Sequence, residues 1–459
     1  MSDWKLEDWI EHIVPKHMRE GNMPGLSIAV VKKGETVYAE GFGSRDKEKN
    51  LPATPDTLYG IGSITKSFVA IGILQLVEKG ELSLEDPVKE HIPFKLGLDD
   101  KPITIHNLMT HSLGVPSLAT SSVAFYRSVG HDTGIPFGSP DDFYRLINDA
   151  REEVVAEPGE RFFYHNAAWR ILGHIIQEKT GTPFHRYIKD NVINPLGMKR
   201  STMNTEEFNA DPDRITPYWK KPDGSIDPTD FPYPNPEDNP EFSFIAAAGG
   251  ITSSVKEMSK YMNALRKKDS GLITRNSFEL MQTLHIHRPD GYYGETGYGY
   301  GLGVTPDFHG KKLVSHGGSI LVSTAHMSMV PEEEIGVIIM GNSAKLAYDA
   351  INESILALLM GMDPVESTPG LYVKQNLKNL VGRYETYKGI ESIEVKYKAG
   401  MLYLESKTPF AETSTPLIPE NTMLEERIFY TLVDGVKSPV VFEGDDLFIE
   451  RYCYHKVCK

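Results

Sequence analysis

A serine and a lysine stand three positions apart at the head of an apolar run, as Ser63 and Lys66 in YGIGSITKSFVAIGILQLVEKG. Positions i and i+3 of a helix face the same way, so this spacing brings a hydroxyl beside an ammonium. A serine hydroxyl becomes a nucleophile when a base takes its proton, and burial lowers the pKa of a lysine towards working pH. The helix N-terminus adds free N–H groups where an oxyanion would form. The pair therefore indicates nucleophilic catalysis.

The pattern S-x-x-K is weak evidence by itself, because it also begins at Ser2 and at Ser253. Ser2 lies at the chain terminus, and Ser253 precedes an ordinary helix, where serine is a common N-cap. Only Ser63 is followed by a helix that is apolar on nearly all sides before Gly80 ends it. Such a helix belongs in a core, so Ser63 and its lysine would be held rigidly at an inner surface.

A nucleophilic serine also needs a group that carries protons to the leaving group and donors that bind the oxyanion. Tyr164-His165-Asn166 precedes a predicted helix, so a phenol and an amide would project from its start. The pattern Y-x-N recurs at Tyr233 and Tyr261, so alone it says little.

A third candidate is the tetrad His316-Gly317-Gly318-Ser319 on a predicted strand. Glycines there let a ligand or another backbone approach closely. The alternative is a β-bulge beside an ordinary histidine.

The length and charge of the chain limit the number of domains and the classes of partner to expect. The chain has 459 residues, which suggests two to three domains, and its formal charge of −15 argues against nucleic acid and anionic membrane as partners. The acidic, amphipathic N-terminus has no apolar signal region, and no apolar stretch is long enough to span a bilayer. We therefore expect a cytoplasmic protein with a docking helix at its start.

Both cysteines lie at the extreme C-terminus. A straight strand would hold Cys453 and Cys458 about 16 Å apart, too far for a disulfide. With His455 they could form a metal site, but three ligands without a fourth favour free thiols in a reducing compartment. We expect no metal and no other cofactor.

The order of the elements predicts two lobes and a further domain. A β-hairpin from Leu26 to Gly43 and several late strands flank a helical block, with Ser63 at the junction of the lobes. A helix is expected from Ile251 to Arg266, and the proline-rich segment 211–240 is expected to form an ordered rim.

The composition of the sequence changes near Val365. The segment STPG, which begins at Ser367, suggests a linker, and from Leu380 onwards short alternating runs predict strands with no convincing helix. The predicted domains are therefore 1–363, with a helical lobe at roughly 58–200, and an all-β barrel or sandwich at 364–459.

The succession of S-x-x-K, Y-x-N and H-x-G resembles the motif order of the serine β-lactamase and penicillin-binding-protein superfamily. The chain is most similar to the branch that holds class C β-lactamases, D-Ala-D-Ala carboxypeptidases, D-aminopeptidases and related esterases. The similarity extends to ITIHNLMTHSLGVP, EPGERFFYHNAAWRILGHII and AAGGITSSVKEMSKYM, and it covers roughly Met23 to Met360. It implies an α+β fold, in which an antiparallel sheet with flanking helices carries an inserted all-helical lobe.

The resemblance also implies roles for the matched residues. Ser63 would attack the substrate carbonyl to form an acyl-enzyme, while Lys66 and Tyr164 would share the proton transfers in an order that the sequence leaves open. Asn166 would orient the lysine and the substrate amide. The backbone N–H groups of Ser63 and Ser319, with Gly318 beside them, would form the oxyanion hole.

His316 departs from the pattern, because β-lactamases and carboxypeptidases usually carry lysine there. The ordinary pKa of histidine is near 6.5, so a fixed cation for a substrate carboxylate is missing. We therefore expect a serine peptidase or amidase acting on short peptides, with peptides that contain D-residues among the candidate substrates. The alternatives are a carboxylesterase and a penicillin-binding or sensor protein that acylates and stalls.

The C-terminal module resembles the lipocalin-like barrels that follow the catalytic lobe in some archaeal and bacterial peptidases of this superfamily. Some of those proteins assemble into closed particles, so the resemblance implies a homo-oligomer.

Overall fold

The computed structural model describes residues 4–98, 100–128, 130–267, 271–344 and 346–457. The chain divides into two compact units, one comprising Asp3–Met360 and the other Gly361–Lys459. The division falls after Met360, close to the predicted boundary at residue 363.

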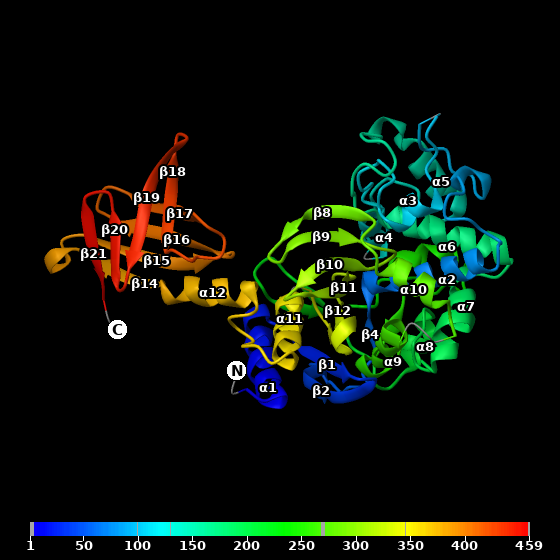
Figure 1. The fold of residues 1–459 in the computed structure, drawn as a ribbon, viewed down its shortest axis with the longest axis horizontal. Coiled ribbons are helices and arrows are strands. Elements are labelled where there is room, and N and C mark those ends of the chain that lie inside the picture. The colour runs from blue at the N-terminus through cyan, green and yellow to red at the C-terminus, as the bar shows by residue number, and fades with distance from the viewer. Residues whose placement is uncertain (1–3, 99, 129, 268–270, 345, 458–459) are drawn as a thin grey trace. The chain divides into compact units, whose positions relative to one another are not determined.

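The larger unit is built on an antiparallel sheet of nine strands in the order β3-β2-β1-β13-β12-β11-β10-β9-β8 (Figure 1). The predicted hairpin is confirmed as β1 and β2, and the late strands complete the sheet on the far side of β1. The strands are β1 (Gly25–Lys32), β2 (Glu35–Asp46), β3 (Leu51–Pro52), β8 (Ile286–Gly291), β9 (Gly294–Tyr298), β10 (Gly303–Phe308), β11 (Lys311–Ser319), β12 (Thr324–Val330) and β13 (Ile335–Gly341).

Helices cover both faces of this sheet. β13 is buried along its whole length, as its continuous apolar run requires. α9 (Val255–Lys267) packs on one face, and α11 (Tyr348–Leu359) with α1 (Leu6–Gly21) on the other (Figure 1). The strands of the central sheet are thereby held rigidly, including the end of β11 that carries the third predicted motif.

The predicted helical lobe is confirmed between the early and late strands. Its helices, with the later α10, are α2 (Thr65–Glu78), α3 (Ile105–Met109), α4 (Thr120–Ser128), α5 (Pro140–Asn148), α6 (Asn166–Thr180), α7 (Phe184–Ile188), α8 (Thr205–Ala210) and α10 (Arg275–Met281). Two short turns matter for the site, η1 (Gly62–Ile64) and η6 (Pro240–Ala248). α2 is buried nearly all round, as its apolar sequence predicts.

Two local predictions need correction or refinement. The helix expected from Ile251 begins only at Val255, because β7 (Thr252–Ser253) pairs with β4 (Tyr59–Gly60) next to Ser63. The proline-rich segment 211–240, which was predicted to form an ordered rim, contains the small sheet of β5 (Tyr218–Lys220) and β6 (Ile226–Pro228).

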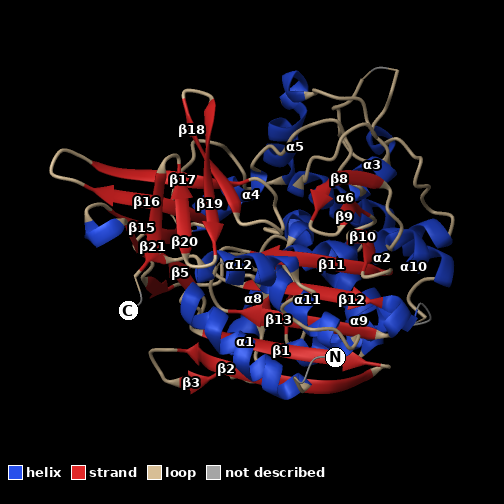
Figure 2. Cartoon of the chain, turned by 60° about the vertical axis from the view of Figure 1, so that its left-hand side comes forward, coloured by secondary structure: helices blue, strands red, loops and turns tan. Residues whose placement is uncertain are grey.

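The smaller unit is a closed all-β barrel, which confirms the barrel alternative (Figure 2). Its strands are β14 (Gly382–Glu385), β15 (Ser392–Lys398), β16 (Met401–Lys407), β17 (Glu412–Pro419), β18 (Ile428–Val433), β19 (Val436–Glu443), β20 (Asp446–Ile449) and β21 (Tyr452–Lys456). α12 (Pro369–Asn379) precedes them where the sequence suggested a linker, and proline fits its first helical position.

Within the described ranges, none of the helices combines the length and the apolar character that crossing a membrane requires.

Candidate active site

Ser63 lies in the tight turn η1, directly before α2. Gly62 in that turn has a φ of +52°, and a Cβ there would come within 2.5 Å of the backbone nitrogen of Ser319. A residue with a side chain could not occupy this position without displacing β11. Glycine therefore lets the backbone of Ser63 lie against the end of β11.

Lys66 Nζ lies 2.9 Å from Ser63 Oγ, as the spacing predicts. The lysine is fully buried, and its other partners are Asn166 Oδ1 at 2.8 Å and the carbonyl oxygen of Ala248 at 2.7 Å. None of these partners is a carboxylate. Burial, with a smaller contribution from the positive charge of Arg170, holds the pKa of Lys66 well below its ordinary value.

Tyr164 and Asn166 come from the start of α6, where the Y-x-N pattern placed them. The Tyr164 hydroxyl is hydrogen-bonded with Ser63, and its ring centroid is 4.9 Å from Lys66 Nζ. Burial raises the pKa of Tyr164 far above its ordinary value, and the hydrogen bond with Ser63 offsets this only in part. The phenol is therefore protonated at neutral pH, whereas the lysine is biased towards the neutral amine.

The backbone of β11 closes the site opposite the helices. A Cβ at Gly318 would lie 1.8 Å from the carbonyl oxygen of Ile61 and 3.1 Å from the nitrogen of Ser63. Glycine is therefore required for β11 to approach the nucleophile this closely. The predicted oxyanion donors, the N–H groups of Ser63 and Ser319, belong to these two adjoining segments.

His316 is buried, and both ring nitrogens are engaged. Nδ1 donates to the carbonyl oxygen of Gly317 at 2.6 Å, so Nε2 accepts from the hydroxyl of Tyr298 at 2.8 Å. Burial, followed by the positive charge of Lys66, lowers the pKa of His316 to about 3. The histidine is therefore a neutral structural group near pH 7, and the ordinary value of 6.5 assumed from the sequence does not apply.

The neutral histidine leads to a prediction about charged substrates. Wild-type protein should hydrolyse benzylpenicillin poorly, whereas His316→Lys should raise kcat/KM for benzylpenicillin relative to a neutral ester, because a cation then faces the substrate carboxylate. The ratio of the two kcat/KM values measures the effect. If the wild type turned over benzylpenicillin as well as its best peptide, the interpretation of His316 would be wrong.

A cavity of about 610 Å³ opens beside Ser63. Its lining combines the site with the helical lobe and the proline-rich segment, and it includes Asn166, Arg170, Phe137, Phe231, Tyr233, Ser319 and Leu321. The volume is ordinary for a small-ligand site, and the apolar walls suit a substrate with a largely apolar body.

The S-x-x-K pair of Ser253 and Lys256 has no such setting. Ser253 Oγ shares a hydrogen bond with Ser201 Oγ at 2.8 Å, and Lys256 forms an exposed ion pair with Asp56 at 2.5 Å. This confirms the structural interpretation of that pair, while Ser2 lies outside the described residues.

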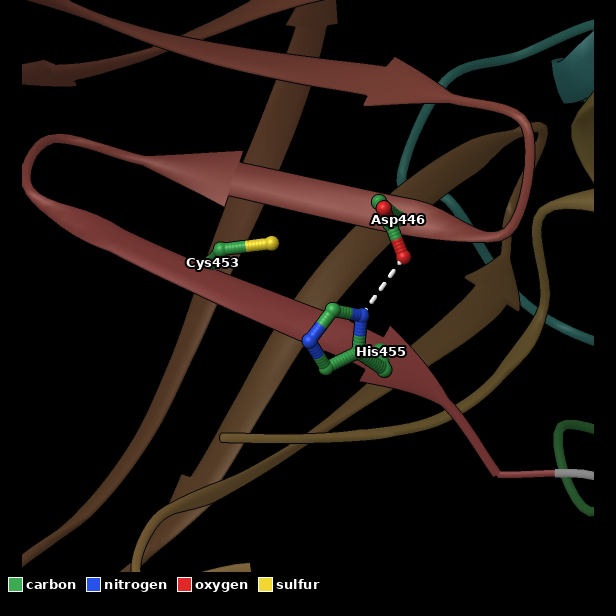
Figure 3. A group of neighbouring side chains, drawn as sticks. All are labelled: Asp446, Cys453 and His455. Atoms are coloured by element: carbon green, nitrogen blue, oxygen red, sulfur yellow. Dashed lines mark hydrogen bonds and ion pairs between the residues drawn. The ribbon is translucent and has the colours of Figure 1, made fainter. Parts of the chain in front are cut away.

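The cysteine and histidine at the C-terminus lie on β21 of the barrel. Asp446 of β20 joins Cys453 and His455, with all three possible ligand atoms within 4.8 Å of one another (Figure 3). The ion pair between His455 Nδ1 and Asp446 Oδ1, at 2.7 Å, accounts for their orientation. Burial and the nearby acidic groups raise the pKa of the Cys453 thiol, which disfavours the thiolate that binds metals. Cys453 is a free thiol, and Cys458 lies outside the described residues.

Comparison with known families agrees with this geometry. The family model named Beta-lactamase matches residues 10–359. The chain belongs to the β-lactamase family. The model of the Pab87 octamerisation domain matches residues 364–455, which form α12 and the barrel.

Several relatives are similar to all or to part of this chain. The octameric penicillin-binding protein homologue from Pyrococcus abyssi is 39% identical, with a TM-score of 0.89 over 97% of this chain and 99% of that one. A penicillin-binding protein from Bacillus halodurans is 25% identical, with a TM-score of 0.59 over 76% of this chain and 98% of that one. Protein flp of Staphylococcus aureus (strain MW2) is 28% identical over 72% of this chain, which spans 62% of that protein's length.

Several groups of this β-lactamase-family site were not predicted from the sequence motifs. The carbonyl of Ala248 binds Lys66 through the backbone and leaves no sequence signal. Tyr298 lies in the glycine-punctuated segment before β10, and its contact with His316 depends on strand register. Arg170 could have been found, because it is one helical turn beyond Asn166 in a predicted helix.

Proposed function

We propose that the protein is a serine peptidase or amidase that cleaves short peptides, including peptides with D-residues, through an acyl-enzyme. The observation that carries this proposal is the contact of Ser63 with the buried Lys66 and with Tyr164. Membership of the β-lactamase family supports hydrolysis through the serine.

The partners of Lys66 support its role as the base. Asn166 Oδ1 and the Ala248 carbonyl can only accept, so each takes one N–H of the amine. In the neutral amine the remaining position is a lone pair, and it faces Ser63 Oγ. Lys66 therefore takes the proton of Ser63 as Oγ forms a bond to the carbonyl carbon of the substrate.

Tyr164 has the protonation state of an acid. As the tetrahedral intermediate collapses, the scissile C–N bond breaks and the phenol gives its proton to the leaving nitrogen, while the Lys66 ammonium returns a proton to Tyr164. A water molecule then attacks the acyl-enzyme, with the same groups acting in reverse. The N–H groups of Ser63 and Ser319 stabilise the oxyanion in both steps.

A panel of peptide p-nitroanilides and p-nitrophenyl esters, with D- and L-residues in matched pairs, tests the proposal. Amide turnover supports a peptidase, whereas turnover of esters alone would indicate a carboxylesterase. A burst of one equivalent of nitrophenol without further turnover would indicate a protein that acylates and stalls.

We also propose that the protein forms a homo-octamer through its barrel domain. The match to an octamerisation domain and the octameric relative from Pyrococcus abyssi support this. Light scattering should give a mass about eight times the 51.3 kDa of one chain. A monomer or dimer at micromolar concentration would contradict the assembly but leave the chemistry unaffected. A cytoplasmic location stays a prediction.

A further inference from the structure

Arg170 lies on the same face of α6 as Asn166, one helical turn further on, and both residues line the cavity beside Ser63. Side chains on a helix tilt towards its N-terminus, which here is the end at the active site. The guanidinium is therefore directed from the body of the helical lobe back towards the nucleophile.

This guanidinium is buried, and none of the residues that the structure describes pairs it with a carboxylate. Arg170 is 1% exposed, and its Nε and Nη2 each donate at 3.3 Å, to the carbonyl oxygen of Ile245 and to Ser121 Oγ. Its Nη1 is also buried and has no hydrogen-bond partner among the described residues. The ring of Phe137 lies 5.5 Å from the guanidinium carbon.

Burying a charge without an opposite charge is expensive, and replacing such a group by an apolar side chain is often neutral or stabilising. Burial lowers the pKa of Arg170 to about 10, so the group remains a cation at neutral pH. Fold stability therefore does not explain an arginine at this position.

The surroundings of Arg170 select for an anion. The described lining of the cavity holds no acidic residue, although the whole chain has a formal charge of −15, and its other cation, Arg127, is exposed to solvent. Because Arg170 is closed off from bulk solvent, a ligand reaches it through the cavity, where a carboxylate can replace Ser121 Oγ and engage Nη1. The planar fork of a guanidinium matches a carboxylate with two parallel hydrogen bonds.

We propose that Arg170 binds a carboxylate on the acyl portion of the substrate, so that the enzyme prefers acyl groups ending in a carboxylate, such as a residue with an acidic side chain. This inference rests on the proposed function, because it needs an acyl group on Ser63 in the same cavity. The carboxylate proposed to bind Arg170 belongs to the acyl portion of the substrate. It is distinct from the carboxylate discussed for position 316, where the resemblance implies a lysine in other members of the family.

The spacing of Asn166 and Arg170 determines how long the acyl chain of a test substrate should be. Side chains at i and i+4 are roughly 6 Å apart, about the length of a four-methylene chain between two carboxyl carbons. The matched substrates are the mono-p-nitrophenyl ester of adipic acid and that of adipamic acid, which has an uncharged terminal amide of the same shape.

Wild-type protein should show a kcat/KM at least tenfold higher for the acid ester than for the amide ester. Arg170→Met should bring this ratio to within twofold of one, mainly by raising KM for the acid ester. Arg127→Met, which removes the exposed cation from the same cavity, should leave the ratio within twofold of wild type. A wild-type ratio near one, or an unchanged ratio in Arg170→Met, would overturn the proposal.

The ratio of kcat/KM for the acid ester to that for the amide ester separates carboxylate binding by Arg170 from two other roles of this residue. If Arg170 only braces the lobe or only lowers the pKa of Lys66, both esters should lose activity equally in Arg170→Met, and the proposal fails. Should Arg170→Met not fold, competitive inhibition of wild type by adipamate but not by adipamide supports the proposal, and equal inhibition by both overturns it.

A binding measurement separates the failure of this inference from the failure of the proposed function. Calorimetry with Ser63→Ala protein should show tighter binding of adipamate than of adipamide, and the difference should vanish in Ser63→Ala/Arg170→Met. Selective binding without any hydrolysis by wild type would support the carboxylate site and contradict the peptidase. Hydrolysis without selectivity would do the reverse.

Discussion

Ser63→Ala should lower kcat/KM for every substrate by about three orders of magnitude or more, because no other group within the described site can form the acyl-enzyme. The fold should persist, since the alanine methyl fits a turn whose conformation is imposed by Gly62. Activity on an activated p-nitrophenyl ester and the thermal unfolding midpoint together measure the effect. A folded variant that kept more than a tenth of wild-type activity would refute the assignment of the nucleophile.

Ser253→Ala is the matched control, because Ser253 begins another described S-x-x-K pattern that precedes a helix. Its loss removes one buried hydrogen bond to Ser201, which costs about 1 kcal/mol of the free energy of unfolding. The sequence suggested that Ser253 caps the following helix, but Ser254 Oγ accepts from the backbone N–H of Glu257 there. Activity should therefore remain within twofold of wild type.

The sequence was informative where local pattern determines structure. The i,i+3 pair, the helix that begins at Asn166 and the strand that ends at Ser319 lie together at the cavity as their order predicts. The hairpin, the inserted helical lobe and the all-β C-terminal unit follow from hydrophobic periodicity and turn residues.

The features of the site that could not be predicted from the sequence depend on packing between distant segments. The pKa of His316 depends on its burial and on the charge of Lys66, both of which arise only in the folded chain. Among the described residues Arg170 has no carboxylate partner, because packing places Ile245 and Ser121 against its guanidinium. The pairing of Thr252–Ser253 with Tyr59–Gly60 likewise joins segments far apart in the sequence. α12 was missed because STPG is typical of both linkers and helix starts.

Lys66→Met should also lower kcat/KM by about 10² to 10⁴, because it removes the general base while retaining a flexible side chain of similar length. The fold should tolerate the change, since it removes a buried amine that has no carboxylate partner among the described residues, although two carbonyl oxygens lose a donor. A folded variant within tenfold of wild type would show that another group removes the Ser63 proton.

The pH dependence of kcat/KM identifies that base. The active form holds Lys66 as a neutral amine, so the wild-type rate should rise with pH through the lowered pKa of Lys66 and then level off, well below the ordinary lysine value. This acid limb should disappear from the residual activity of Lys66→Met. It should persist in Tyr164→Phe, whose loss should be greater for amides than for esters because amides need a protonated leaving group.

Arg170 provides an independent check on the same limb. Its positive charge lies near Lys66 and disfavours the ammonium, so Arg170→Met should raise the pKa of Lys66 and move the acid limb to higher pH for charged and neutral substrates alike. If the limb stayed in place in Arg170→Met and Lys66→Met but vanished in Tyr164→Phe, the phenol of Tyr164 would be the base. The raised pKa of Tyr164 argues against that outcome, because a phenol held in its protonated form is a donor and not an acceptor of the Ser63 proton.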